Sequence, residues 1–274
     1  MAFWGDYHTH TQYSHGKGTV MDNALVAKEK GLKQIAITDH GLRHIIFGIR
    51  RRQLPSLRRD CTEATEATGV HVLAGVENNI CDFDGLFDLK QKDLDMLDIV
   101  QGGFHKAVWC RSIGKQFAFQ FRNMYRNLFS TSPKKLVAKN TDAYLKLIDN
   151  YELDFIGHIN RDIRVDILTV ARYAKQKGTY MELNSKQLTL KKSGITDKDI
   201  EKMAQEGVEF VCNSDAHSPE RVGDMKAALE VIERLHIPYS QIANWEKFPL
   251  FRSSNYAHAT GAIDADKHED GDIL

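Results

Sequence analysis

Nine side chains of the types that bind metal ions recur along this chain, each at or just beyond the end of a short apolar run. They are His8, His10, His15, His40, Glu77, His105, His158, Asp215 and His217, and they include seven of the twelve histidines. Histidines scattered over a surface would not follow the ends of predicted strands. Imidazoles and carboxylates that meet at one end of a sheet are what a hydrolase with several metal ions requires.

The number of these residues matters more than any one of them. His8 and His10 are two residues apart, as are Asp215 and His217, so each pair points to one face of extended chain. An isolated pair of this kind is more often an accident than a ligand pair. Here six of seven predicted strands end in such a residue, and burying them all without a cation would leave unmatched charges. An open catalytic zinc site uses about three or four protein ligands, so the set predicts two or three ions.

The elements that must position these residues alternate along the chain. Seven mostly continuous apolar runs are typical of strands buried on both faces of a parallel sheet. We predict strands at Phe3–Asp6, Gln34–Thr38, His71–Ala74, Asp98–Gln101, Asp154–Ile156, Thr179–Leu183 and Glu209–Cys212. We predict helices at Met21–Lys30, Leu54–Thr68, Leu89–Leu97, Thr141–Tyr151, Asp166–Lys177, Thr196–Glu206 and Asp224–Leu235. The alternation predicts an α/β barrel in a single domain over residues 1–250, with its chemistry at the carboxyl ends of the strands.

Two segments break this alternation. Residues 106–140 are predicted to form an insertion that is rich in lysine and arginine, has no acidic residue, and contains Phe117, Phe119, Phe121, Tyr125 and Phe129. It is either a lid over the site or a platform for single-stranded nucleic acid, although aromatic residues at this spacing are more often packing anchors. Residues 253–274 are acidic and poor in apolar residues, so we expect a loose tail.

The overall composition narrows the class of protein. Lysine plus arginine equals aspartate plus glutamate at 37 each, which argues against a general binder of nucleic acid or of membrane surfaces. We find no signal peptide and no apolar run of the roughly 18–20 residues that a membrane helix needs, so we expect a cytoplasmic protein. Four widely spaced cysteines are predicted to be free buried thiols, namely Cys61, Cys81, Cys110 and Cys212.

Several short motifs, in this order, resemble those of the polymerase-and-histidinol-phosphatase (PHP) superfamily of metal-dependent phosphoesterases. The matching segments are residues 6–10, 13–15, 37–41, 75–79, 103–105, 157–158, 181–184 and 213–217, within a resemblance that runs from about residue 5 to about residue 244. The likeness is greatest to stand-alone bacterial phosphatases. It implies a distorted (β/α)7 TIM-like barrel with a trinuclear metal site.

The resemblance also implies how the ligands are shared. The first ion would be held by His8, His10, Glu77 and Asp215; the second by Glu77, His105 and His158; and the third by His15, His40 and His217. A carboxylate has two oxygens and can bridge two ions, which suits Glu77. Sites rich in imidazole favour zinc or manganese, with iron as a further possibility, over calcium or magnesium.

This site predicts hydrolysis of a phosphate ester. Two neighbouring ions can hold a hydroxide between them and direct it at phosphorus. We expect His8, His10, Glu77, His105, His158 and Asp215 to hold this nucleophile. Arg43, Lys106 and Arg161 lie near the predicted ligands and are expected to bind the phosphate, and Lys106 and Arg161 to assist catalysis as well. Asp39 and Glu182 are candidates for orienting the imidazoles.

Other functions remain open at this point. The leading hypothesis is a monoesterase acting on a small phosphorylated metabolite, with histidinol phosphate as one possible substrate. A phosphodiesterase or nuclease acting on nucleotide or single-strand ends is the first alternative, and nucleic acid is the less favoured partner. Hydrolysis of C–N or C–O bonds is a second alternative, and a non-catalytic metal-binding module is a third. The sequence does not predict the oligomeric state.

Overall fold

The predicted barrel is confirmed by the computed structural model, which describes residues 3–110, 112–128 and 133–253. Its strands are β1 (Gly5–Thr9), β2 (Gln34–His40), β3 (His71–Asn79), β4 (Ile99–Gly103), β5 (Phe155–Ile156), β6 (Tyr180–Asn184) and β7 (Phe210–Asn213). All neighbours pair in parallel and in sequence order. The sheet nearly closes, because the N–H of His10 donates to the carbonyl of Ala216 at 2.8 Å and Thr9 forms a parallel bridge with Ala216.

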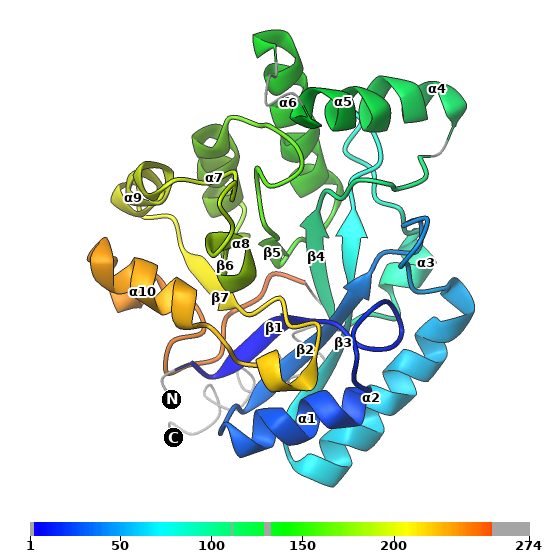
Figure 1. Ribbon diagram of the computed structural model, residues 1–274, viewed down its shortest axis with the longest axis vertical. Helices are drawn as coiled ribbons and strands as arrows, with labels where there is room; N and C mark the ends of the chain where they lie inside the picture. Colours follow the sequence, from blue (N-terminus) through cyan, green and yellow to red (C-terminus); the bar gives the residue numbers. More distant parts are fainter. Residues whose placement is uncertain (1–2, 111, 129–132, 254–274) are drawn as a thin grey trace, which may run out of the picture.

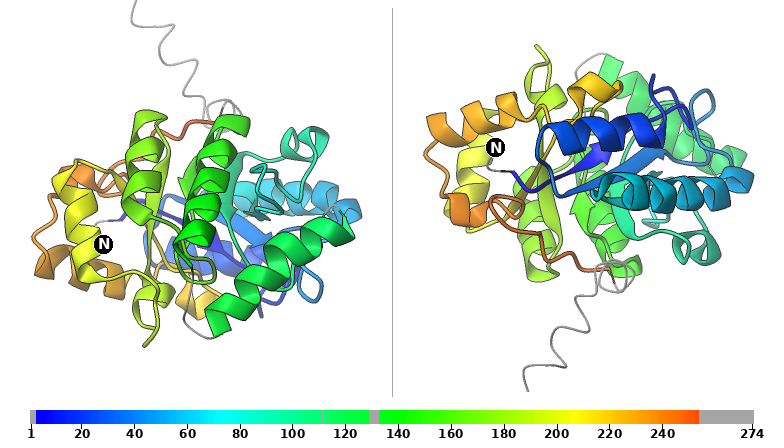
Figure 2. Two further views of the ribbon diagram at one scale, coloured as in Figure 1. Left: turned by 90° about the horizontal axis from the view of Figure 1, so that it is seen from above. Right: turned by 90° about the horizontal axis from the view of Figure 1, so that it is seen from below.

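Helices surround this sheet (Figures 1 and 2). The longer ones are α1 (Val20–Glu29), α2 (Leu54–Thr68), α6 (Lys134–Asn150), α7 (Ile167–Gln176), α9 (Asp197–Gln205) and α10 (Lys226–Arg234), and the short ones include α3 (Gln91–Leu94) and α8 (Ser185–Leu188). Their ends follow from local chemistry. Thr19 and Thr196 begin α1 and α9 with capping boxes, and Gly69 ends α2 in the left-handed conformation with φ of 75°.

Two helix predictions are wrong in their bounds. The stretch predicted at 89–97 is helical only in α3, because the Asp93 side chain caps the N–H of Lys90 and the chain then turns into β4. Helix α6 begins at Lys134, directly after Pro133, whose fixed φ suits a helix start. The last seven residues of the predicted insertion, 134–140, therefore belong to α6, and Leu136 is buried there.

The floor of the barrel is apolar and is closed by the segment after β7. Side chains from six strands fill the interior and are fully buried: Tyr7, Ala36, Leu73, Ile99, Phe155 and Val211 lie there. Phe251 packs below them, with its ring centroid 4.9 Å from that of Tyr7 and 5.8 Å from that of Tyr180. Ser253 is buried and donates its N–H to Asp154 Oδ1 at 2.7 Å. Ser253, the first residue of the predicted loose tail, is therefore packed against the barrel. Residues 254–274 lie outside the described part.

The insertion is helical and fixed to the barrel. Its elements α4 (Ile113–Lys115), the π-helix η2 (Gln116–Phe121) and α5 (Arg122–Leu128) lie above the arrowheads of β3 and β4 (Figure 1). Phe119 is fully buried, and its ring centroid lies 4.9 Å from that of Phe83 and 5.6 Å from that of Phe104. Phe119 is therefore a packing anchor, whereas Phe117 and Phe121 expose 63% and 44% of their surface. Arg111 and Phe129 lie outside the described residues.

Two further expectations concern the chain as a whole. All four cysteines are free and buried, as the sequence predicts. Among the helices that the structure describes, none is long and apolar enough to cross a membrane.

Candidate metal centre

All nine predicted ligands meet at the carboxyl end of the barrel. Glu77 lies near the end of β3, is fully buried, and is the centre of the group. Five imidazoles bring a ring nitrogen within 3.7 Å of its carboxylate, those of His8, His10, His40, His105 and His158. His40 Nδ1 lies 2.7 Å from Glu77 Oε2. One carboxylate therefore contacts predicted ligands that come from four different strand ends.

Asp215 organises the other side of the group. Its Oδ1 atom lies 3.4 Å from His10 Nε2 and 3.2 Å from His217 Nδ1. His15 completes the set, with its ring centroid 4.3 Å from that of His217 and 4.8 Å from that of His40. Asp215 and His158 have positive φ values of 55° and 25°. Residues other than glycine are held in such backbone conformations mainly at functional sites.

The charges of the two carboxylates are set by the histidines around them. Burial alone would raise the pKa of Glu77, but His105, His8 and His158 hold it well below its usual range. The same balance lowers the pKa of Asp215 well below its ordinary value, with burial opposed by His8 and His10. Both side chains are therefore anionic at neutral pH and ready to bind a cation.

Two of the imidazoles have pKa values that are shifted in opposite directions. Burial, followed by His217 and His40, lowers the pKa of His10 well below its usual value, so His10 is neutral and offers a lone pair. Burial opposes protonation of His8 too, but the carboxylates of Glu182 and Glu77 raise its pKa well above the ordinary value. In the metal-free protein, a proton on His8 thus balances part of the negative charge of these carboxylates.

The residues present fit a group of transition-metal ions. Among the described buried atoms, both ring nitrogens of His10 have no hydrogen-bond partner, and Nδ1 of His40 and Oε2 of Glu77 lie 2.7 Å apart without hydrogen-bond geometry. Buried polar atoms are rarely left without one. Ligand atoms also approach within 4.8 Å of one another in three sets, which are His10, His40 and His217; His8, His10 and Glu77; and His40, Glu77 and His105. Donors of this kind favour zinc, manganese or iron.

Side chains behind the ligands hold them in place. Glu182, at the end of β6, contacts His8 Nδ1 at 2.7 Å and accepts the backbone N–H of His158 at 2.7 Å, so it orients the site as predicted. Among the described residues, no hydrogen bond or ion pair joins Asp39 to an imidazole. It accepts the backbone N–H of Thr11 at 2.8 Å and a hydrogen bond from Ser14, and so it fixes the loop that carries His15.

The three predicted phosphate-binding residues differ in their surroundings. Arg161 Nη1 lies 3.5 Å from Asp215 Oδ2, at the edge of the group. Lys106 follows His105 and pairs with Asp162 at 2.7 Å. The guanidinium of Arg43 instead lies 3.4 Å and 3.3 Å from two carbonyl oxygens, those of Trp109 and Cys110. Arg43 thus supports the start of the insertion, and its predicted contact with phosphate gains no support from these bonds.

Three residues at the site were missed in the sequence. Lys186 places Nζ 3.2 Å from Asp215 Oδ1 and 2.9 Å from His217 Nδ1, and His44 stacks on His40 with ring centroids 5.2 Å apart. Asn79 places Oδ1 2.8 Å from His105 Nδ1. Asn79 offered a signal, because it follows Glu77 by two residues on one strand. Lys186 lies just beyond the one predicted strand that carries none of the nine predicted ligands.

The fold and the metal centre together define a class of hydrolase, and comparison with known proteins identifies the family. The family model for the PHP domain matches residues 6–186, so the chain belongs to this family. It is 30% identical over 249 residues to a probable phosphatase of Caldanaerobacter subterraneus, covering 87% of this chain and 86% of the relative. A probable phosphatase of Shewanella piezotolerans is 31% identical over 255 residues, with 89% and 90% covered. The chain is a metal-dependent phosphoesterase of this family.

A solved structure shares the fold. The histidinol phosphate phosphatase of Lactococcus lactis, determined with zinc, L-histidinol and phosphate, superposes with a TM-score of 0.58 at 17% identity. The match covers 85% of this chain and 94% of the Lactococcus protein. This similarity supports the barrel architecture and carries no conclusion about the substrate of the present protein.

Proposed function

We propose that this protein hydrolyses small phosphate monoesters at a trinuclear metal centre. The observation that carries the proposal is the contact of the Glu77 carboxylate with five imidazoles, because a single buried carboxylate so surrounded is a ligand for more than one ion. The ions would be zinc or manganese, with iron as a further choice.

We propose that the nine ligands are divided among three ions, with Glu77 shared by two of them. One ion would use His8, His10, Glu77 and Asp215; a second would use Glu77, His105 and His158; and a third would use His15, His40 and His217. The third set is supported by His15 and His217, whose rings lie beside those of His10 and His40 and which form no ion pair with Glu77 among the described residues. His40 also lies 2.7 Å from Glu77 and so stands between the second and third sets. Ions bound here would activate water as a nucleophile and neutralise the charge of the phosphoryl group.

The protein's own residues would bind and orient the ester. Arg161 reaches the edge of the centre and offers a guanidinium whose geometry suits two phosphoryl oxygens. Lys106 offers a second positive charge from the loop after His105. Asp162 contacts both cations, at 2.7 Å from Lys106 Nζ and 3.8 Å from Arg161 Nε, and so it sets their positions before the substrate arrives.

Removal and return of metal test the proposal. The purified protein should contain zinc, manganese or iron by elemental analysis, and chelation should abolish phosphate release from a panel that includes glycerol phosphate, histidinol phosphate and phenyl phosphate. Addition of zinc or manganese should restore it. A protein that binds two or three of these ions and hydrolyses no member of the panel would overturn the proposed activity.

A nuclease or phosphodiesterase is the second candidate. It is favoured by the exposed aromatic rings of the insertion, since Phe117 and Tyr125 expose 63% and 58% of their surface and lie among basic residues. The same panel extended with bis(p-nitrophenyl) phosphate and a short single-stranded oligonucleotide separates the two functions. Product from the oligonucleotide and the diester alone would replace the monoesterase proposal.

A further inference from the structure

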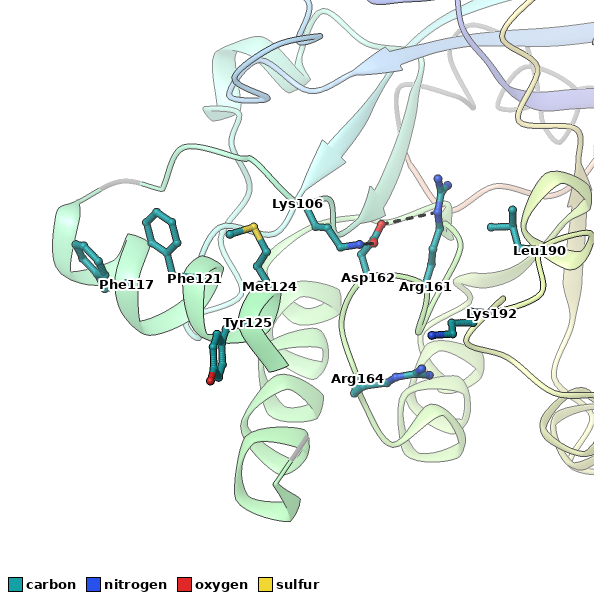
Figure 3. A pocket seen from close by; sticks show the side chains of 10 residues that line it. All are labelled: Lys106, Phe117, Phe121, Met124, Tyr125, Arg161, Asp162, Arg164, Leu190 and Lys192. Carbon is teal, nitrogen blue, oxygen red and sulfur yellow. Dashed lines mark ion pairs between the residues drawn. The ribbon is translucent and has the colours of Figure 1, made fainter. Parts of the chain in front are cut away.

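A cavity of about 850 Å³ opens beside the metal centre, between the insertion and the loops that follow β5 and β6 (Figure 3). Its size is in the range of pockets that bind small molecules. One wall comes from η2 and α5 and presents Phe117, Phe121, Met124 and Tyr125. The facing wall presents Arg161, Arg164, Leu190 and Lys192, and Lys106 and Asp162 lie between the two.

The apolar wall is exposed although its helix is fixed. Phe117 and Phe121 stack with ring centroids 5.0 Å apart and an interplanar angle of 29°. Met124 and Tyr125 expose 36% and 58% of their surface on the same wall. The segment is held by buried Phe119, so these rings are presented to solvent on a rigid support. A rigid, exposed group of aromatic residues beside an active site is suited to binding a flat apolar group.

The facing wall carries two positively charged side chains without carboxylate partners among the described residues. Within the part of the chain that the structure describes, neither Arg164 nor Lys192 forms an ion pair with a carboxylate. Arg164 is held by a hydrogen bond of 3.2 Å from its Nη1 to the carbonyl of Gly194, and its backbone carbonyl accepts from Asn140 at 2.9 Å. Two cations that are not neutralised by the protein and face a cavity are suited to an anionic ligand.

Arg161 joins this cavity to the metal centre. Its side chain lines the cavity, and its Nη1 lies 3.5 Å from Oδ2 of the proposed ligand Asp215. A phosphoryl group bound by the ions and by Arg161 would therefore direct the rest of the ester into the cavity. The cations at Arg164 and Lys192 would then meet the far end of the leaving group.

We infer that this cavity is the leaving-group subsite, and that it selects phosphate monoesters whose alcohol is flat and apolar and carries a second anionic group. The inference rests on the proposed phosphatase activity and adds the substrate class to it. The second anion is a carboxylate or a phosphate-like group, since both bind arginine and lysine in the same way. The volume of about 850 Å³ suits one such small molecule.

Esters of simple alcohols test the inference, because their leaving groups differ little in reactivity. The metal-loaded protein is assayed with ethyl phosphate, benzyl phosphate, 4-carboxybenzyl phosphate and 4-phosphonobenzyl phosphate. We expect kcat/KM to rise about tenfold from ethyl to benzyl, and about fivefold more when a second anion is added. The carboxylate and phosphonate arms show which anion the protein prefers. Equal kcat/KM values for all four esters would overturn the inference.

Variants locate the selectivity. Lys192→Gln and Arg164→Gln should each reduce the preference for 4-carboxybenzyl over benzyl phosphate by about two- to fivefold. The control is Lys191→Gln, since Lys191 is an exposed neighbour that does not line the cavity and should leave the preference unchanged. Phe121→Ala should reduce the preference for benzyl over ethyl phosphate about fivefold, whereas Ile113→Ala, an exposed apolar control on the same insertion, should not. Equal effects of target and control would contradict the assignment.

Binding measurements separate this inference from the proposed activity. Calorimetry with benzylphosphonate and 4-carboxybenzylphosphonate, which cannot be hydrolysed at the ester position, reports the cavity without turnover. If the protein hydrolyses no ester but binds the carboxylated phosphonate several-fold more tightly, and Lys192→Gln removes that difference, the proposed activity fails and the subsite stands. If esters are hydrolysed but the two phosphonates bind equally, the subsite inference fails alone.

Discussion

His8 is held between two carboxylates, with Nδ1 2.7 Å from Oε1 of Glu182 and Nε2 3.2 Å from Oε1 of Glu77. Glu182 also accepts the N–H of His158 with its second oxygen and a hydrogen bond of 3.0 Å from Asn213 Nδ2. It therefore fixes two of the proposed ligands from behind while Glu77 faces the site. A carboxylate in this position orients an imidazole and increases its basicity as a ligand.

Replacing Glu182 should weaken metal binding without removing a ligand. Glu182→Gln keeps the shape of the side chain but removes the negative charge that His8 faces, so we expect the affinity for zinc to fall about 10- to 100-fold. Titration of the metal-free protein with zinc and a competing chelator measures this. Glu209→Gln is the control, because Glu209 is exposed just before β7. An unchanged zinc affinity in Glu182→Gln would show that the contact does not support the site.

Replacing Glu77 should be far more damaging. Glu77→Gln leaves five imidazoles around a neutral amide and removes the proposed bridge, so we expect kcat/KM to fall by orders of magnitude, about 100-fold or more. Elemental analysis should show fewer ions per chain than in the wild-type protein. Normal turnover with normal metal content would contradict the central role given to this carboxylate.

Much of this architecture is encoded in local patterns. Six of the seven strands agree with their predicted bounds to within three residues at each end, because strands buried on both faces are continuous apolar runs. The prediction for β3 ends five residues too early, because the polar residues Glu77, Asn78 and Asn79 continue that strand. The ligands were predicted for a related reason, since the carboxyl ends of parallel strands meet at one end of a barrel. This rule and the residue types alone were enough to predict that His105 and Glu77 lie close together.

The features that were missed depend on contacts between distant segments. Lys186 has no metal-binding chemistry of its own, and only the folded chain brings it to Asp215. Asp39 lies next to the predicted ligand His40 and was therefore a candidate for orienting an imidazole. In the folded protein its carboxylate instead accepts hydrogen bonds from Thr11 and Ser14. The role of Phe251 under Tyr7 also required the fold, because a single aromatic residue in an irregular segment has no periodicity that predicts burial.

The anchor of the insertion gives a prediction for both stability and substrate binding. Phe119→Ala removes a fully buried ring from between Phe83 and Phe104, so we expect the free energy of unfolding to fall by about 3–5 kcal/mol. Loosening the insertion should also raise KM for benzyl phosphate more than for ethyl phosphate. Urea unfolding and steady-state kinetics measure the two effects.

The neighbouring Phe117 supplies the matched control for stability. Phe117→Ala alters a ring that is 63% exposed, so its effect on the free energy of unfolding should stay within about 0.5 kcal/mol. A loss of stability as large as that of Phe119→Ala would mean that the two rings do not differ in the way the structure describes.

The barrel floor should carry a pH-dependent contribution to stability that is independent of the metal centre. Burial raises the pKa of Asp154 to about 7, although its carboxylate accepts N–H groups of Val100 and Ser253 at 2.7 Å each. Between the ordinary value of 3.8 and about 7, the folded protein therefore binds more protons at this side chain than the unfolded chain does. The associated stability is complete below pH 3.8, and it is lost as the pH rises through about 7.

Asp154→Asn tests this effect, because the amide cannot ionise. From pH 5 to pH 7 the free energy of unfolding of the wild-type protein should lose about 2 kcal/mol through Asp154, and the variant should lack that slope. Urea titrations at several pH values, with the metal-loaded protein throughout, measure the difference. Asp95→Asn is the control, since Asp95 is exposed and should leave the slope as it is. Parallel pH profiles for wild type and Asp154→Asn would show that the buried carboxyl is ionised in the folded protein already at pH 5.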